Sequence, residues 1–216
     1  MKKIASPLFQ DLSEAELDTL AAAGHLRTRQ FAKHEVIFHA GSCVREIGIV
    51  LRGSVHIENL DLWGTKSILS SVGAGQAFAE TYAFCGEALM VDAVAAEHCE
   101  ILFLHTAAFT DARIEPALKD KLLRRLLAVS MRKNLSLSQR IFCTTPKTVR
   151  GRLLTYFPAQ AARCGRMEFE VPFNRQQMAD YLNLDRSALS KELCKMRDEG
   201  LLEFDKNRFV LKQLPE

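Results

Sequence analysis

The stretch NRQQMADYLNLDRSALSKEL, residues 174–193, decides the fold of the C-terminal part of this chain. Asn174, with Gln177 three residues later, has the spacing of a capping box, which predicts that a helix begins there. Asn183 is the kind of non-glycine residue that best tolerates a left-handed turn, and Asp185 can cap a following helix. The stretch therefore predicts two short helices joined by a tight turn.

The second of these helices has two faces of different chemistry. Its inner face is apolar and consists of Ala188, Leu189 and Leu193. Its opposite face offers four hydrogen-bond donors, two of them cations: Arg186, Ser187, Ser190 and Lys191. A helix packed on one side and offering donors on the other is typical of a DNA recognition helix, although a helical hairpin with a solvated face shares the pattern.

The residues that follow predict a β-hairpin. Gly200 is a natural helix stop, and residues 201–204 and 208–211 have strand character around a turn at 205–207. A helix-turn-helix followed at once by a hairpin is a winged helix-turn-helix. We expect further contacts to double-stranded DNA from the start of the first helix and from the wing, at Arg175, Gln176, Lys206 and Arg208.

Composition places the chain among globular proteins. It has 216 residues, of which 48% are hydrophobic and 25% charged, and a net charge of only +3, so charge alone does not indicate nucleic acid. No apolar run reaches the length of a membrane span or of a signal peptide, so we expect a cytoplasmic protein without membrane contacts. The six cysteines are scattered without CxxC pairs, which favours reduced thiols over disulfides or a zinc site.

Between residues 25 and 104 the pattern changes to short β segments separated by glycines, with a hairpin turn expected at Arg52–Gly53. This spacing predicts a small barrel or jelly roll. An enzyme with cupin-like metal chemistry would need clustered histidine and glutamate ligands, and His34, Glu35 and His39 lack that arrangement. No catalytic triad or phosphate-binding loop is present either, so we expect neither a catalytic site nor a metal site.

Residues 116–142 have apolar residues at three- and four-residue steps, which predicts one long helix. Self-association through this helix would use a seam of Leu122, Leu123, Leu126, Val129, Leu137 and Ile141; the alternative is a buried helix in a monomer. The predicted class is therefore α+β, with a β-roll or jelly roll at 1–115, a dimerisation helix at 116–143 and a winged helix-turn-helix at 144–216.

Four segments in this order resemble the CRP/FNR family of bacterial transcription regulators: HEVIFHAGS at 34–42, IGIVLRGSVHIEN at 47–59, GAGQAFAE at 73–80 and FNRQQMADYLNLDRSALSKELCKMRDEGLL at 173–202. The resemblance covers nearly the whole chain. It implies a homodimer on a palindromic operator that recruits or blocks RNA polymerase, with an effector sensed in the β-roll.

The chain departs from the family's known sensors. Cyclic-AMP-binding members use a Gly-Glu pair and an arginine, whereas this chain has Ala79-Glu80 and no arginine between Glu80 and Glu100. A cyclic phosphate needs a cation or a row of backbone donors, so cyclic AMP is disfavoured. Residues 1–42 contain no cysteine for an iron–sulfur centre. No cofactor is expected, although haem ligation stays open at His25, His34, His39, His56, His98 and His105.

The family's effector pocket lies between the β-roll and the long helix. By this resemblance, the lining of the pocket in this chain would be Phe78, Glu80, Tyr82, Cys85, Leu89, Ser130 and Asn134. This set favours a small organic or aromatic effector. Three alternatives stay open: a pocket filled by side chains, redox sensing through Cys43 or Cys85, and a module that has lost specific DNA reading.

The recognition helix also departs from the family motif Glu-x-x-Ser-Arg. Ser190 matches, but Ser187 replaces the acid, and Lys191 replaces an arginine and so loses its bidentate fork to guanine. We expect Arg186 to be a principal base reader on an operator of different sequence. Glu192 stands where many members have an apolar residue.

Overall fold

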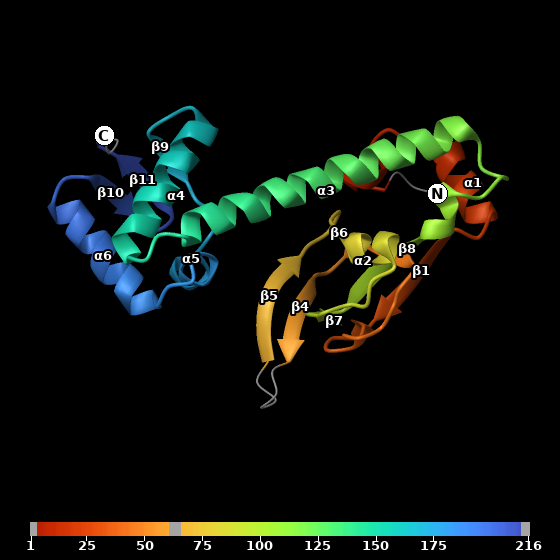
Figure 1. The fold of residues 1–216 in the computed structure, drawn as a ribbon, viewed down its shortest axis with the longest axis horizontal. Coiled ribbons are helices and arrows are strands. Elements are labelled where there is room, and N and C mark those ends of the chain that lie inside the picture. The colour runs from red at the N-terminus through yellow and green to blue at the C-terminus, as the bar shows by residue number, and fades with distance from the viewer. Residues whose placement is uncertain (1–3, 61–65, 213–216) are drawn as a thin grey trace. The chain divides into compact units, whose positions relative to one another are not determined.

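The computed structural model describes residues 4–60 and 66–212, and the chain divides into two compact units, Met1–Arg132 and Lys133–Glu216 (Figure 1). The division falls inside the long helix α3 (Pro116–Thr144), so the first part of α3 belongs to unit 1 and the second to unit 2. The predicted α+β class, with a β-roll, a long helix and a winged helix-turn-helix, is confirmed.

Unit 1 begins with η1 (Pro7–Phe9) and α1 (Glu14–Ala22), which starts with a capping box formed by Ser13 and Glu16. Two antiparallel sheets follow. The first has the order β1 (Leu26–Phe31), β8 (Cys99–His105), β3 (Glu46–Arg52) and β6 (Ala77–Phe78). The second has the order β2 (Val36–Phe38), β7 (Asp92–Ala95), β4 (Val55–Leu60) and β5 (Lys66–Val72). The short helices α2 (Glu80–Cys85) and η2 (Thr106–Phe109) complete the roll.

The expected hairpin at Arg52–Gly53 is wrong. The strands on either side, β3 and β4, lie in different sheets and do not pair with one another. Gly53 has φ +84°, and a Cβ there would lie 2.7 Å from the carbonyl oxygen of His98. Glycine is therefore required because the chain makes a tight left-handed passage from one sheet to the other.

Aromatic side chains fill the interior between the two sheets. Phe103 packs edge-on against Phe31 and Phe38, with ring centroids 6.1 and 5.6 Å apart, and Phe38 also packs against Phe78. Gly48 makes room for this cluster, since a Cβ at that position would lie 2.2 Å from the Phe78 ring. The β-roll is therefore closed by its own side chains at this level.

The first part of α3 packs on unit 1 through one apolar stripe. Leu118, Leu122 and Leu126 are buried in the same core as α1. The prediction that Leu122 and Leu126 belong to a dimer seam is therefore wrong, because both side chains are already covered within the chain. Leu123, Leu127 and Met131 lie on another side of the helix and are about half exposed.

Unit 2 consists of the end of α3, then α4 (Val149–Cys164), α5 (Arg175–Tyr181) and α6 (Arg186–Asp198), with a three-stranded antiparallel sheet. The sheet has the order β10 (Leu202–Asp205), β11 (Arg208–Leu211) and β9 (Glu168–Glu170). Its core joins the helices to the sheet through fully buried rings, among them Tyr156, Phe157, Phe169 and Phe209.

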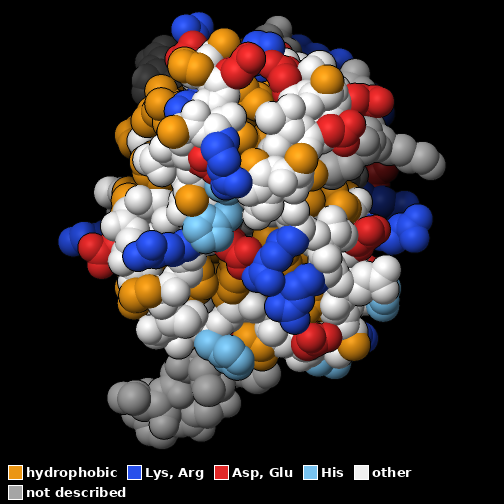
Figure 2. Space-filling model, turned by 90° about the vertical axis from the view of Figure 1, so that its right-hand side faces the viewer, with side chains coloured by type: hydrophobic (Ala, Val, Ile, Leu, Met, Phe, Trp, Pro, Cys, Tyr) orange, Lys and Arg blue, Asp and Glu red, His pale blue; other side chains and the backbone are white. Residues whose placement is uncertain are grey.

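The charged surface of unit 1 is mixed in sign. Arg27 pairs with Glu46 at 2.5 Å, and Arg113 pairs with Asp111 at 2.7 Å. Figure 2 shows Lys and Arg side chains lying among Asp and Glu side chains on the face turned to the viewer. A surface of alternating sign does not attract a polyanion over a broad area.

Candidate nucleic-acid interface

The start of α5 is fixed by a reciprocal cap. Asn174 Oδ1 accepts a hydrogen bond from the Gln177 backbone N–H at 2.9 Å, and Gln177 Oε1 accepts one from the Asn174 N–H at 2.9 Å. Two donors that a helix start leaves unpaired are thereby satisfied. Arg175 and Gln176, the residues predicted to contact DNA, occupy the first turn beyond this cap. Gln176 Nε2 also donates to Asp180 Oδ1 at 2.8 Å.

The turn between α5 and α6 has the expected chemistry. Asn183 is left-handed, with φ +52°. Asp185 Oδ1 accepts hydrogen bonds from the backbone N–H groups of Ser187 and Ala188 at 2.8 and 2.9 Å. The Ser187 hydroxyl donates to the same oxygen, and together these bonds lower the pKa of the Asp185 carboxyl. The carboxylate therefore stays ionised at the positive end of α6.

The two faces of α6 are those that the sequence predicts. Leu189, Leu193 and Met196 are buried against the unit 2 core. The other face exposes Arg186, Ser187 and Lys191, with Ser190 partly exposed. Because the Ser187 hydroxyl proton is engaged by Asp185, this residue offers its oxygen outward as an acceptor.

Two arginines that sequence reasoning missed support the helix-turn-helix from behind. Arg152 in α4 donates to the carbonyl oxygens of Leu182 and Asn183 at 2.8 and 2.6 Å. Arg140, near the end of α3, donates to those of Asp180 and Tyr181 at 3.1 and 3.0 Å. These carbonyls lie at the end of α5, where a helix leaves acceptors unpaired. The sequence carries no local signal for these contacts, because donor and acceptor are 30 or more residues apart.

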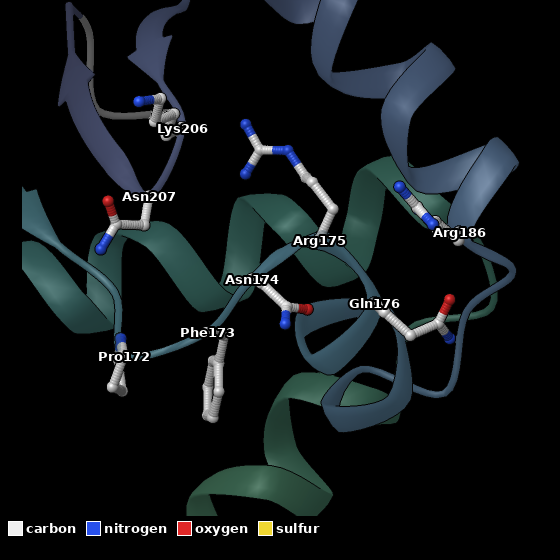
Figure 3. A pocket seen from close by; sticks show the side chains of 8 residues that line it. All are labelled: Pro172, Phe173, Asn174, Arg175, Gln176, Arg186, Lys206 and Asn207. Atoms are coloured by element: carbon white, nitrogen blue, oxygen red, sulfur yellow. The ribbon is translucent and has the colours of Figure 1, made fainter.

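An open hollow of about 710 Å3 lies where the starts of α5 and α6 meet the wing turn (Figure 3). Eight residues line it: Pro172, Phe173, Asn174, Arg175, Gln176, Arg186, Lys206 and Asn207. Three of these are cations and none is an acid. The hollow thus brings together Arg175, Gln176, Arg186 and Lys206, four of the residues predicted from sequence to contact DNA. A concave surface with three cations and no carboxylate in its lining suits an anionic ligand.

The remaining predicted DNA contacts lie outside this hollow. Ser187, Ser190 and Lys191 follow along the outer face of α6. Arg208 on β11 forms an ion pair with Glu168 on β9. This pairing partly neutralises Arg208, so its contribution to an anion site is smaller than that of Lys206.

Comparison with known proteins identifies both halves of this arrangement. Residues 28–113 match the family model of the cyclic nucleotide-binding domain, and residues 151–216 match that of the Crp-like helix-turn-helix domain. The chain belongs to the CRP/FNR family. It is therefore a DNA-binding transcription regulator of the CRP type. No curated protein sequence matches the chain closely enough to count as a relative.

Solved structures of CRP-type proteins have the same fold. The Catabolite Activator Protein of Thermus thermophilus is 25% identical, with 96% of this chain and 94% of that chain covered and a TM-score of 0.50. FixK2 from Bradyrhizobium japonicum is 19% identical over 87% and 93%, with a TM-score of 0.54. The c-di-GMP responsive regulator CLP of Xanthomonas campestris is 18% identical over 93% and 100%, with a TM-score of 0.56. The last two show likeness of fold alone.

Within the CRP-type β-roll, the residues predicted for the effector pocket differ in accessibility. Phe78 is a core residue, and Glu80 and Leu89 are buried. Tyr82, which is partly exposed, and Cys85, which is exposed, lie on α2. Ala79, which replaces the family's glycine, has φ +62°, a conformation that glycine adopts without strain.

The other two predicted pocket residues lie on α3. Ser130 is partly exposed and belongs to unit 1, whereas Asn134 is exposed and belongs to unit 2. Neither position is tested as part of a pocket, so both remain predictions.

The predicted dimer seam of the CRP-type helix is retained only in part. Leu123, Leu137 and Ile141 are exposed, and Val129 is half buried. The predicted seam did not include several other apolar residues of α3 that are exposed: Leu127, Met131, Leu135 and Phe142. Leu127 and Met131 follow Leu123 at four-residue steps, and this spacing could have predicted that both belong to the seam.

No group of three or more His, Cys, Asp or Glu side chains within residues 4–60 and 66–212 is placed to hold a metal ion. Over the same ranges, no helix is both long enough and apolar enough to cross a membrane. Of the histidines considered as haem ligands, His25 contacts Asp111 at 2.7 Å, and His105 accepts a hydrogen bond from the Ala107 N–H.

Proposed function

We propose that this protein is a homodimeric regulator that binds a two-fold symmetric operator in double-stranded DNA. Each protomer would place α6 in the major groove, with Arg186, Ser190 and Lys191 facing base edges. The observation that carries this proposal is the hollow between α5, α6 and the wing, which gathers three cations and no acid beside the exposed face of α6. By family resemblance, binding would recruit or block RNA polymerase.

The dimer is supported by the exposed apolar side chains of α3. Leu123, Leu127 and Met131 lie at four-residue steps, so they form one stripe on a single side of the helix. An apolar stripe on a helix gains free energy when it is covered, and a second copy of the same helix offers a complementary stripe. A dimer would also place two α6 helices on the two halves of one operator.

The effector is proposed to be a small molecule other than a cyclic nucleotide bound in the usual way. The chain between Glu80 and Glu100 offers no arginine for a cyclic phosphate, and the roll interior is occupied by phenylalanine rings. A calorimetric titration with cyclic AMP should therefore give no binding at micromolar concentrations. Micromolar affinity would overturn this part of the proposal and leave the DNA-binding part standing.

Selection of bound sequences from a random DNA pool tests the main proposal. The purified protein should enrich a two-fold symmetric site with half-sites about one helical turn, roughly 10 base pairs, apart. A matched variant with Arg186→Ala and Lys191→Ala should fold, since both side chains are exposed, and should enrich no site. If neither the protein alone nor the protein with cell extract enriches any sequence, the proposal is wrong.

A further inference from the structure

The Arg175 guanidinium lies against two aromatic rings of the wing. Its Cζ atom is 4.9 Å from the ring centroid of Phe204 on β10 and 5.0 Å from that of Phe209 on β11. The two rings are 6.0 Å apart and tilted by 37°. They form a shelf, here called the Phe204–Phe209 shelf, over which the cation is held.

Arg175 is unusual for a half-buried cation because, within the described part of the chain, no carboxylate forms an ion pair with it. Burial lowers the pKa of its guanidinium, although this group remains charged at any ordinary pH. Buried cations are normally paired with an acid. The two aromatic faces offset part of the cost of desolvating Arg175, and its charge stays available to a ligand.

The contact with the rings leaves the hydrogen-bond donors of Arg175 available, since within residues 4–60 and 66–212 its guanidinium forms no hydrogen bond. A guanidinium that lies over a ring uses its face, whereas its five N–H donors point outward in its own plane. Figure 3 shows Arg175 rising from the start of α5 between Lys206 on the wing turn and Arg186 on α6. The outward edge of the guanidinium therefore opens into a hollow whose other cations attract the same anion.

We infer that Phe204 is a positioning residue for DNA, whose ring holds Arg175 ready to clamp one backbone phosphate of the operator. This inference rests on the proposed function. Without the ring, the arginine would sample many rotamers and lose conformational entropy on binding. The Phe204–Phe209 shelf removes this entropy cost before DNA binds. Lys206, which is left-handed and lies at the tip of the same hairpin, lines the same hollow as Arg175.

Salt-dependent operator binding by the full-length protein tests this inference. A plot of log K against log salt concentration has a negative slope. Arg175→Gln should make this slope less steep by about 0.9, the value expected for one lost phosphate contact. Phe204→Leu should weaken binding about three- to tenfold and should also make the slope less steep, since a displaced arginine contacts the phosphate less often. Phe204→Tyr keeps the ring face and should restore both the affinity and the slope.

Double variants separate positioning from a merely structural role. The loss of affinity from Phe204→Leu should add little to that from Arg175→Gln, because the ring acts through that arginine. Arg197, whose Cζ also lies 5.6 Å from the Phe204 centroid, is paired with Asp198. In the matched control, the loss of affinity from Phe204→Leu should add in full to that from Arg208→Gln, since the Arg208 guanidinium is held by Glu168. Phe204 is only partly buried, and thermal melting checks that each variant folds.

The possible failures are distinguishable. The inference is overturned if Phe204→Leu leaves the salt slope unchanged, or if its loss of affinity adds in full to that of Arg175→Gln. In either case, operator binding by the wild type still supports the proposed function. If the wild-type protein selects no DNA under any condition, the proposed function and the inference fail together.

Discussion

The guanidinium Nε of Arg150 in α4 lies 2.6 Å from Oε1 of Glu192 in α6. A second nitrogen of the same guanidinium lies 2.7 Å from Oε1 of Glu199, the C-cap residue of α6. This contact explains the acid at position 192, where many CRP/FNR members have an apolar residue. Arg150 joins Glu192 and Glu199 to α4, so ion pairs help to hold α6 against α4 in this chain.

The Arg150 contact should make the helix-turn-helix sensitive to acid. Hydrogen bonding to Arg150 lowers the pKa of Glu199, so its stabilisation is complete above the unfolded value near 4.3 and is lost as pH falls through the lower folded pKa. Between about pH 6 and about pH 3, the melting temperature of Arg150→Met should therefore fall less than that of the wild type. Parallel decreases in the two proteins, followed by circular dichroism, would contradict this expectation.

Arg186→Ala should weaken operator binding by about 1–3 kcal/mol and relax the preference at one base position. Arg186 is exposed at the first position of α6 and lines the cationic hollow, so either a base or a phosphate is within its reach. Competition binding with single-base operator variants distinguishes the two. An equal loss on every sequence would make Arg186 a phosphate contact only.

Met131→Glu should separate the proposed dimer. Met131 is 52% exposed, so the substitution leaves the monomer core intact but would place an unpaired charge in the interface, at a cost of about 3–5 kcal/mol. Sedimentation velocity should show monomers at concentrations where the wild type is dimeric. Ser136→Glu is the matched control, because Ser136 is also exposed but lies on another side of α3 and should leave the dimer unchanged. A dimeric Met131→Glu would move the interface elsewhere.

Gly48→Ala should destabilise the β-roll by about 1–3 kcal/mol, because the added methyl group overlaps the Phe78 ring. Urea unfolding monitored by circular dichroism measures this loss. A compensating Phe78→Leu change should recover part of the loss by shortening the side chain that clashes. If Gly48→Ala is as stable as the wild type, the interior of the roll is less tightly packed than the ring contacts indicate.

Local sequence by itself determined the helix boundaries and the faces of the DNA-reading helix. The capping box at Asn174, the left-handed Asn183 and the cap at Asp185 all formed as predicted. The two caps depend on hydrogen bonds between residues at most three positions apart, so a short window contains the information for them. The same holds for α1, which begins at its own Ser13 cap.

Only the tertiary structure decided which surfaces were left exposed. The periodicity of α3 contains two apolar stripes, and no local rule tells which one the β-roll core covers; Leu122 and Leu126 were buried, and Leu127 and Met131 were not. Likewise, the Arg175 shelf depends on Phe204 and Phe209, about 30 residues further along the chain. Burial and stacking result from contacts between distant segments, and their free energy exists only once the whole core has assembled.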